Sequence, residues 1–155
     1  MKNKLIKILF IIILSLNLSE LTYGKEFTFN ASEIEVKDNG NIYKSLNRGE
    51  ISDNSQIKII SDNFEYLRKT NSLKATGNVY LQDNKNNITI KTEKIFYLKN
   101  DEKIYTTGKT TITISNKYTI KGYDLIFLRN KMTLSSDKKV VINDNFLNIY
   151  KFNEF

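Results

Sequence analysis

Carboxylates at equivalent places of a repeated pattern are the residues of this chain best suited to chemistry. Asp62 follows Ser61, and Glu93 follows Thr92, at the same position of two successive copies. Two neighbouring carboxylates can act as general acid and base. The chain has no histidine and no cysteine, which removes the commonest general base and thiolate zinc sites. A polar side chain that hydrogen-bonds at a strand bend explains Asp62 and Glu93 more simply, so we expect no catalysis, no cofactor and no metal site.

These carboxylates belong to a repeat that organises most of the chain. The stretch 57–83 holds an alternating apolar run, a break in phase near Asp62–Asn63, a polar turn and a second alternating run around Gly77. Side chains of a strand alternate between faces, so a break in phase predicts a bulge or bend that re-aims the strand. The pattern recurs at intervals of 29 to 31 residues, and its copies begin at Phe27, Ile57, Ile88, Tyr118 and Leu147.

The repeat also predicts where the chain turns. A lone glycine lies near the centre of three copies, as a bend in a strand requires, and Lys138 takes its place in the fourth; the glycines are Gly49, Gly77 and Gly108. Polar turn signals separate strands rich in Ile, Thr, Tyr, Phe and Val, without helical periodicity. We therefore expect an all-β, repeat-built structure. Bends are expected at or near Ser32–Glu33, Asp62–Asn63, Glu93–Lys94 and Tyr123–Asp124.

The first 24 residues have the organisation of a secretory signal peptide. Residues 1–7 are basic, residues 8–16 form a short apolar core, and Thr22 and Gly24 supply small residues before the expected cleavage point. A retained anchor needs about 20 apolar residues, so cleavage is favoured. We expect residues 25–155 to form one domain outside the cytoplasm. Because the copy that begins at Leu147 breaks off early, we expect this domain to be incomplete at its C-terminal end.

The formal net charge of +7 is compatible with an anionic partner such as nucleic acid, a membrane or a phosphorylated glycolipid. A solvated lysine-rich surface that aids solubility explains the charge more simply.

The alternating apolar positions predict an interior. Repeats bury their apolar faces only against neighbouring repeats, so stacked copies would enclose either a packed core or an apolar slot along the stack. The expected lining residues are Ile57, Ile59, Leu73, Val79, Leu81, Ile88, Ile90, Ile104, Ile112, Ile120, Val140 and Ile142. The same parity places Tyr118 and Leu134 inward.

The segments IKIISDNFEY (57–66) and SLKATGNVYL (72–81) resemble the OstA-like periplasmic domain of the LptA family of lipopolysaccharide transport proteins. The opening FTFNASEIEV (27–36) after a signal peptide is most like the N-terminal domain of LptD proteins. The resemblance covers the chain from about Phe27 to its end, although Lys138 departs from the glycine pattern.

The resemblance implies a twisted, open β-jelly roll without catalysis, in the periplasm and associated with the outer membrane. Lipopolysaccharide acyl chains would lie in the apolar slot, with the sugar and phosphate part at the open seam. Partners would be lipopolysaccharide and other Lpt-type jelly-roll proteins, joined head to tail by strand addition, and in an LptD-type chain an outer-membrane barrel downstream; no nucleic acid is expected.

Two alternatives stay open at this point. One is a self-assembling structural β-repeat protein whose interior is only core. The other is a basic extracellular binder of polyanions.

Overall fold

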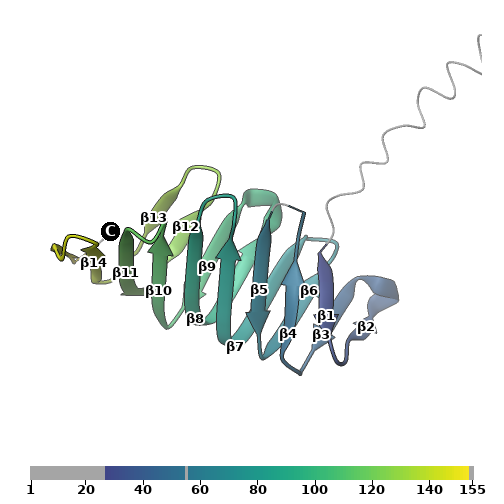
Figure 1. Ribbon diagram of the computed structural model, residues 1–155. Coiled ribbons are helices and arrows are strands. Elements are labelled where there is room, and N and C mark those ends of the chain that lie inside the picture. Colours follow the sequence, from purple (N-terminus) through teal and green to yellow (C-terminus); the bar gives the residue numbers. More distant parts are fainter. Residues whose placement is uncertain (1–26, 55, 154–155) are drawn as a thin grey trace, which may run out of the picture.

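The strands of the computed structural model form two antiparallel layers that share their two longest strands (Figure 1). The structure describes residues 27–54 and 56–153, so the predicted signal peptide lies outside the described residues. The first layer runs in the order β1 (Thr28–Ala31), β4 (Gly49–Ser52), β5 (Ile57–Ser61), β7 (Ser72–Asp83), β8 (Ile88–Leu98), β10 (Lys109–Ile114), β11 (Tyr118–Tyr123), β14 (Val140–Asp144) and β15 (Ile149–Phe152).

The second layer is built from the remaining strands and from the other halves of β7 and β8. Its order is β2 (Glu35–Lys37), β3 (Ile42–Ser45), β6 (Asn63–Leu67), β7, β8, β9 (Lys103–Thr107), β12 (Ile126–Leu128) and β13 (Thr133–Ser135). Two short 3₁₀ turns, η1 (Asp38–Gly40) and η2 (Lys99–Asp101), are the only helical segments among the described residues. The predicted all-β jelly roll is confirmed.

The chain passes from one layer to the other along one side of the sandwich, which we call the hinge. Asp62 separates β5 from β6, residues 32–34 separate β1 from β2, and Asp124 lies between β11 and β12. The strand β8 continues through Glu93, but its buried residues change parity between Thr92 and Ile95. The predicted changes of phase therefore coincide with the passages between layers.

Glycine is required at the hinge of β7. Gly77 and Asn78 both have positive φ, and the pairing of β7 with β8 shifts register between Thr76 and Val79. A Cβ at Gly77 would lie 2.7 Å from Asp62 Oδ2. In the fourth copy, Lys138 forms an ion pair with Asp124 instead.

Opposite the hinge, the turns of the two layers face each other along a second side, which we call the seam. The described residues in the turns of the first layer are 53–54 and 56, 84–87, 115–117 and 145–148, and those in the turns of the second layer are 38–41, 68–71, 99–102 and 129–132. Between hinge and seam, the inner faces pack into one apolar core.

Candidate functional site

One continuous row of apolar side chains crosses the inner face of the first layer. Each member is paired in register with the next, from β1 to β15: Phe29, Ile51, Ile59, Leu81, Ile90, Ile112, Ile120, Ile142 and Tyr150. Cross-strand neighbours of this kind lie within contact distance on one face of a sheet. The repeat therefore produces an aliphatic stripe along the length of the stack.

A second row crosses the facing layer. It joins Val36, Tyr43, Tyr66, Leu73, Tyr97, Ile104, Phe127 and Leu134 in register. This row is more aromatic, and at its β2 end the rings of Tyr43 and Tyr66 pack around Phe29 with centroid distances of 5.3 and 5.6 Å. The interior is thus an aliphatic wall facing a partly aromatic one.

Nearly all of the predicted lining residues lie in this interior. Exposure is 4% or less for Ile57, Ile59, Leu73, Val79, Leu81, Ile88, Ile90, Ile104, Ile112, Ile120 and Val140. Ile142 and Leu134 are half-buried, and Tyr118 is 47% exposed, contrary to the parity argument. Ile142 lies on β14, next to the edge strand β15. Tyr118 is the first residue of β11, beside the turn 115–117, whereas Ile120 on the same face of that strand is 4% exposed. That these side chains line a lipid path stays a prediction.

The aromatic wall of the interior is missing from the predicted lining residues. The missed side chains are the buried residues of opposite parity, including Phe64, Tyr66, Tyr97 and Phe127. The signal was present in the sequence, because each repeat carries an apolar pair just after its phase break.

At the hinge, the carboxylates have a structural role. Asp62 accepts hydrogen bonds from Asn78 Nδ2 and Arg48 Nη1, each at 2.6 Å. These two bonds hold the pKa of Asp62 below its ordinary value. Asp124 Oδ1 accepts a hydrogen bond from the Gly108 amide at 2.7 Å, whereas Glu93 is exposed. The expectation that an acidic residue hydrogen-bonds at the bend is thus confirmed for Asp62.

At the seam, Arg129 is the centre of a buried polar network. Its side chain is 3% exposed, Nε donates to Asp83 Oδ2 at 2.8 Å and Nη1 donates to Tyr97 Oη at 2.9 Å. A further ion pair joins Arg129 to the half-exposed Glu102. Burial raises the pKa of the Asp83 carboxyl, but hydrogen bonds from Arg129 and Asn86 outweigh burial and hold that pKa below its ordinary value. Burial raises the pKa of the Tyr97 hydroxyl, so this group stays neutral.

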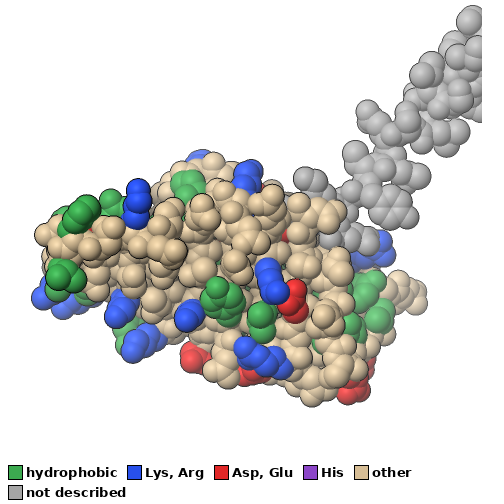
Figure 2. All heavy atoms as spheres, in the orientation of Figure 1, with side chains coloured by type: hydrophobic (Ala, Val, Ile, Leu, Met, Phe, Trp, Pro, Cys, Tyr) green, Lys and Arg blue, Asp and Glu red, His purple; other side chains and the backbone are tan. Residues whose placement is uncertain are grey.

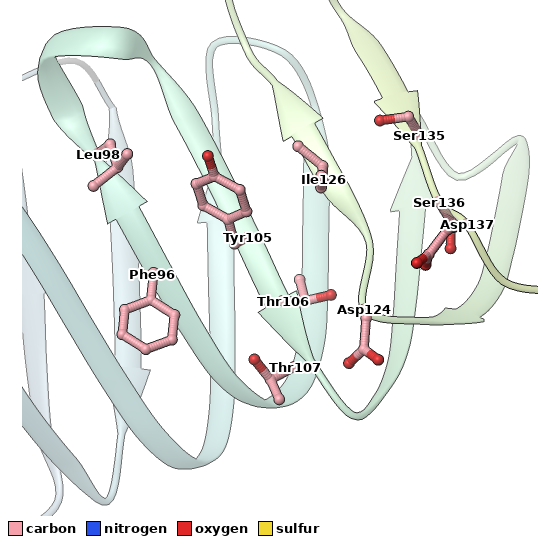
Figure 3. A pocket seen from close by; sticks show the side chains of 10 residues that line it. All are labelled: Phe96, Leu98, Tyr105, Thr106, Thr107, Asp124, Ile126, Ser135, Ser136 and Asp137. Carbon is pink, nitrogen blue, oxygen red and sulfur yellow. The ribbon is translucent and has the colours of Figure 1, made fainter.

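A cavity of about 990 Å³ lies on the outer face of the second layer, outside the core (Figure 3). Its apolar lining comes from Phe96, Leu98, Tyr105 and Ile126. These residues alternate along β8, β9 and β12 with buried ones, so they point away from the interior.

Among the described residues, no group of three or more acidic, histidine or cysteine side chains is placed to hold a metal ion. In the same part of the chain, no helix is long and apolar enough to cross a membrane.

These features define a class of fold, a repeat-built β-jelly roll with a continuous apolar interior. A solved structure with a similar fold is that of LptH from Pseudomonas aeruginosa, described as the LptA-homologous periplasmic component of the conserved lipopolysaccharide transport device. The two structures superpose with a TM-score of 0.66 over 83% of this chain and 94% of LptH, at 10% sequence identity. At this identity the likeness concerns the fold. No model of a known protein family matches the sequence, and no curated protein matches it.

Proposed function

We propose that this protein is a periplasmic component of lipopolysaccharide transport that binds acyl chains between its two layers and passes them along the stack. The observation that carries the proposal is the pair of apolar rows, which run from one end of an LptA-type jelly roll to the other. Each methylene removed from water contributes roughly 0.8 kcal/mol, so several acyl chains supply a large gross affinity. Losses of conformational freedom offset much of it, which suits a carrier that must release its cargo.

Site-specific photocrosslinking in cells tests this proposal. A diazirine side chain at Val79 or Ile59, both buried in the interior, should label lipopolysaccharide. The matched control is Lys91, which is exposed on the outer face of the same layer, and it should label little. Labelling from Lys91 without labelling from Val79 would refute an interior path and favour the alternative of a polyanion-binding surface.

We propose further that neighbouring jelly-roll proteins join this one by strand addition at its ends. Of the described strands, β1 and β15 border the first layer, while β2 and β13 border the second. Edge strands present unpaired backbone groups that another chain can continue. The β15 end is also apolar on its surface (Figure 2), where Phe146, Leu147 and Ile149 are 79%, 89% and 62% exposed.

A proline at Thr28, which lies in the edge strand β1, tests the strand addition. Proline removes an N–H group, so it blocks pairing where that group faces the partner. The variant Thr28→Pro should weaken association with a bridge protein and leave crosslinking from Val79 intact, whereas Thr28→Ala should bind normally. Unchanged association throughout a proline scan of 27–31 would exclude this edge.

The sequence favours the N-terminal part of an LptD-type protein, and we propose this as the specific role. Its test is the downstream reading frame, which should continue into amphipathic barrel strands. A stop codon directly after Phe155 would favour an LptA-type bridge protein instead.

A further inference from the structure

Two ion pairs cross the seam, and they are copies of each other in the repeat. Asp53 pairs with Lys99 at 3.5 Å, and Asp83 pairs with Arg129 at 2.8 Å. Each pair joins residues that are 46 positions apart, and the second pair lies 30 residues after the first. Both carboxylates end the first layer at its turns, and both cations begin the turns of the second layer. The same link between layers has therefore been made twice.

Backbone geometry confirms the equivalence of the two cations. The Lys99 amide donates to Asn71 O at 3.1 Å, and the Arg129 amide donates to Glu102 O at 2.8 Å. The carboxylates are held alike: Asp53 Oδ1 accepts the Ile57 amide at 3.0 Å, and Asp83 Oδ1 accepts the Asn86 amide at 3.2 Å. Both partners of each pair are thus oriented by their own turns before they meet across the seam.

Two neighbouring aromatic rings lie between the two ion pairs. Lys99 Nζ lies 4.3 Å from the centroid of the Phe27 ring, and Arg129 Cζ lies 5.8 Å from that of Tyr97. The Phe27 and Tyr97 centroids are 6.0 Å apart. A chain of contacts therefore links one pair to the other, and groups in contact are expected to be energetically coupled.

Burial of these charges makes them better suited to a reversible closure than to permanent stabilisation. The side chains of Asp53 and Asp83 are 0% exposed, and those of Lys99 and Arg129 are 7% and 3% exposed. Buried ion pairs add little net stability, because desolvation offsets their attraction. When the layers separate at the seam, all four charges regain water, so opening here costs less than opening an apolar contact of the same area.

In the register of the first layer, Asp83 pairs with Ile88 and Ile88 pairs with Ile114, so the next equivalent position is Ile114, which cannot form an ion pair. It is half-buried at the end of β10. Beyond it lie the strands whose inner residues, such as Ile142, are only half-covered. The closed part of the seam therefore ends before β11.

We propose that Asp53–Lys99 and Asp83–Arg129 are paired ionic clasps that hold the seam shut, and that their joint opening admits acyl chains to the interior. This inference rests on the proposed function for its cargo, but the clasps themselves can be tested without lipid.

The first test measures the seam directly. The chain has no cysteine, so spin labels can be placed at Lys85 and Met132, exposed residues of the two facing turns that line one cavity over Arg129. In Asp53→Asn/Asp83→Asn, the distance distribution between the labels should gain a longer component. The matched control is Glu50→Gln/Glu65→Gln, which removes two ion pairs from outer faces and should leave the distribution unchanged. Superimposable distributions for the clasp variant and the native chain would overturn the inference.

The second test keeps the clasp residues and locks the seam. A cleavable bismaleimide between Lys85→Cys and Met132→Cys should lower the rate of fluorescent lipopolysaccharide uptake by at least about tenfold, and cleavage should restore it. Asp53→Asn/Asp83→Asn should raise the rate by about tenfold, which corresponds to about 1.4 kcal/mol. The control bridge joins Lys85→Cys to Lys117→Cys, in adjacent turns of the same layer, and should not slow uptake.

Equal uptake by the two bridged proteins would overturn the clasps as a gate while leaving lipid binding intact. If no form takes up lipopolysaccharide, the proposed function fails, and the label distances still decide whether the clasps hold the seam.

Discussion

Replacement of Arg129 by methionine should destabilise the protein strongly at neutral pH. The change removes the hydrogen bonds to Asp83 and Tyr97. It leaves the Asp83 carboxylate, which is 0% exposed, without a counter-charge. Removing one partner of a buried ion pair costs about 3–5 kcal/mol. A domain of this size is stable by only about 5–15 kcal/mol in total, so the loss should be a large fraction of the whole.

The penalty should shrink as the pH falls. In the native chain the pKa of Asp83 lies below its ordinary value of 3.8. The stabilisation it gives is present above that value and is lost as the pH falls through the folded-state pKa. Without Arg129, burial raises the pKa of Asp83 against the hydrogen bonds from Asn86 alone, so the folded variant binds a proton more readily than the folded native protein. The difference in stability between variant and native protein should therefore decrease from about pH 7 to about pH 4.

Urea unfolding followed by circular dichroism, repeated across this pH range, measures both the loss of stability at neutral pH and its decrease at lower pH. The double variant Asp83→Leu/Arg129→Met removes both charges of the buried pair. It should therefore be more stable at pH 7 than Arg129→Met, which leaves the Asp83 carboxylate unpaired. The control Arg48→Met breaks the exposed pair with Asp62 and should cost a small fraction of the Arg129 effect. A loss below about 1 kcal/mol for Arg129→Met, or a loss that does not vary with pH, would refute the argument.

Two further substitutions test the interior and the hinge. Ile90→Asp places a charge at a position that is 0% exposed, and it should cost several kcal/mol, seen as a large fall in melting temperature. Lys91→Asp, on the outer face of the same strand, should change stability by no more than about 0.5 kcal/mol. Equal losses of stability in the two variants would contradict the assignment of Ile90 to the inner face and Lys91 to the outer face. Gly77→Ala should destabilise more than Gly40→Ala in urea unfolding. Both have positive φ, which costs about 1–2 kcal/mol for alanine, but only at Gly77 would the new Cβ clash, at 2.7 Å from Asp62 Oδ2, whereas at Gly40 its nearest neighbour is Tyr43 Oη at 3.9 Å. If the two alanine variants are equally stable, contact with Asp62 is not what demands glycine in β7.

Most of the layer architecture could be predicted from the sequence, because one local rule is repeated. Alternation gives the inward face, and the break in phase near Asp62 marks the passage between layers. The rule failed at Tyr118, the first residue of β11, which is exposed although Ile120 on the same face is buried. Parity gives the face to which a side chain points, but not how far along the strand that face is covered.

The seam network could not be predicted from the same pattern. Asp83 and Arg129 are 46 residues apart, about one and a half repeats. This offset is set by how the layers fold over each other and not by the period itself. A partial signal exists, since carboxylates recur at Asp53 and Asp83 and cations at Arg68, Lys99 and Arg129, each about one repeat apart. The sequence shows that the charges are periodic, but only the packed layers show which acid meets which base.

Under the proposed function, the composition of the first-layer row bears on how acyl chains would move through the interior. From β4 to β14, every strand of that row presents isoleucine or leucine: Ile51, Ile59, Leu81, Ile90, Ile112, Ile120 and Ile142. An acyl chain that enters must displace contacts between the two walls, and each methylene it buries contributes roughly 0.8 kcal/mol in return. Because successive strands of this row offer nearly the same surface, the contribution of the first layer to this exchange is nearly the same at every step. A uniform row therefore gives no preferred stopping point between Phe29 and Tyr150. A polar residue at one central step, such as Ile90→Asn, should then slow passage through the whole interior.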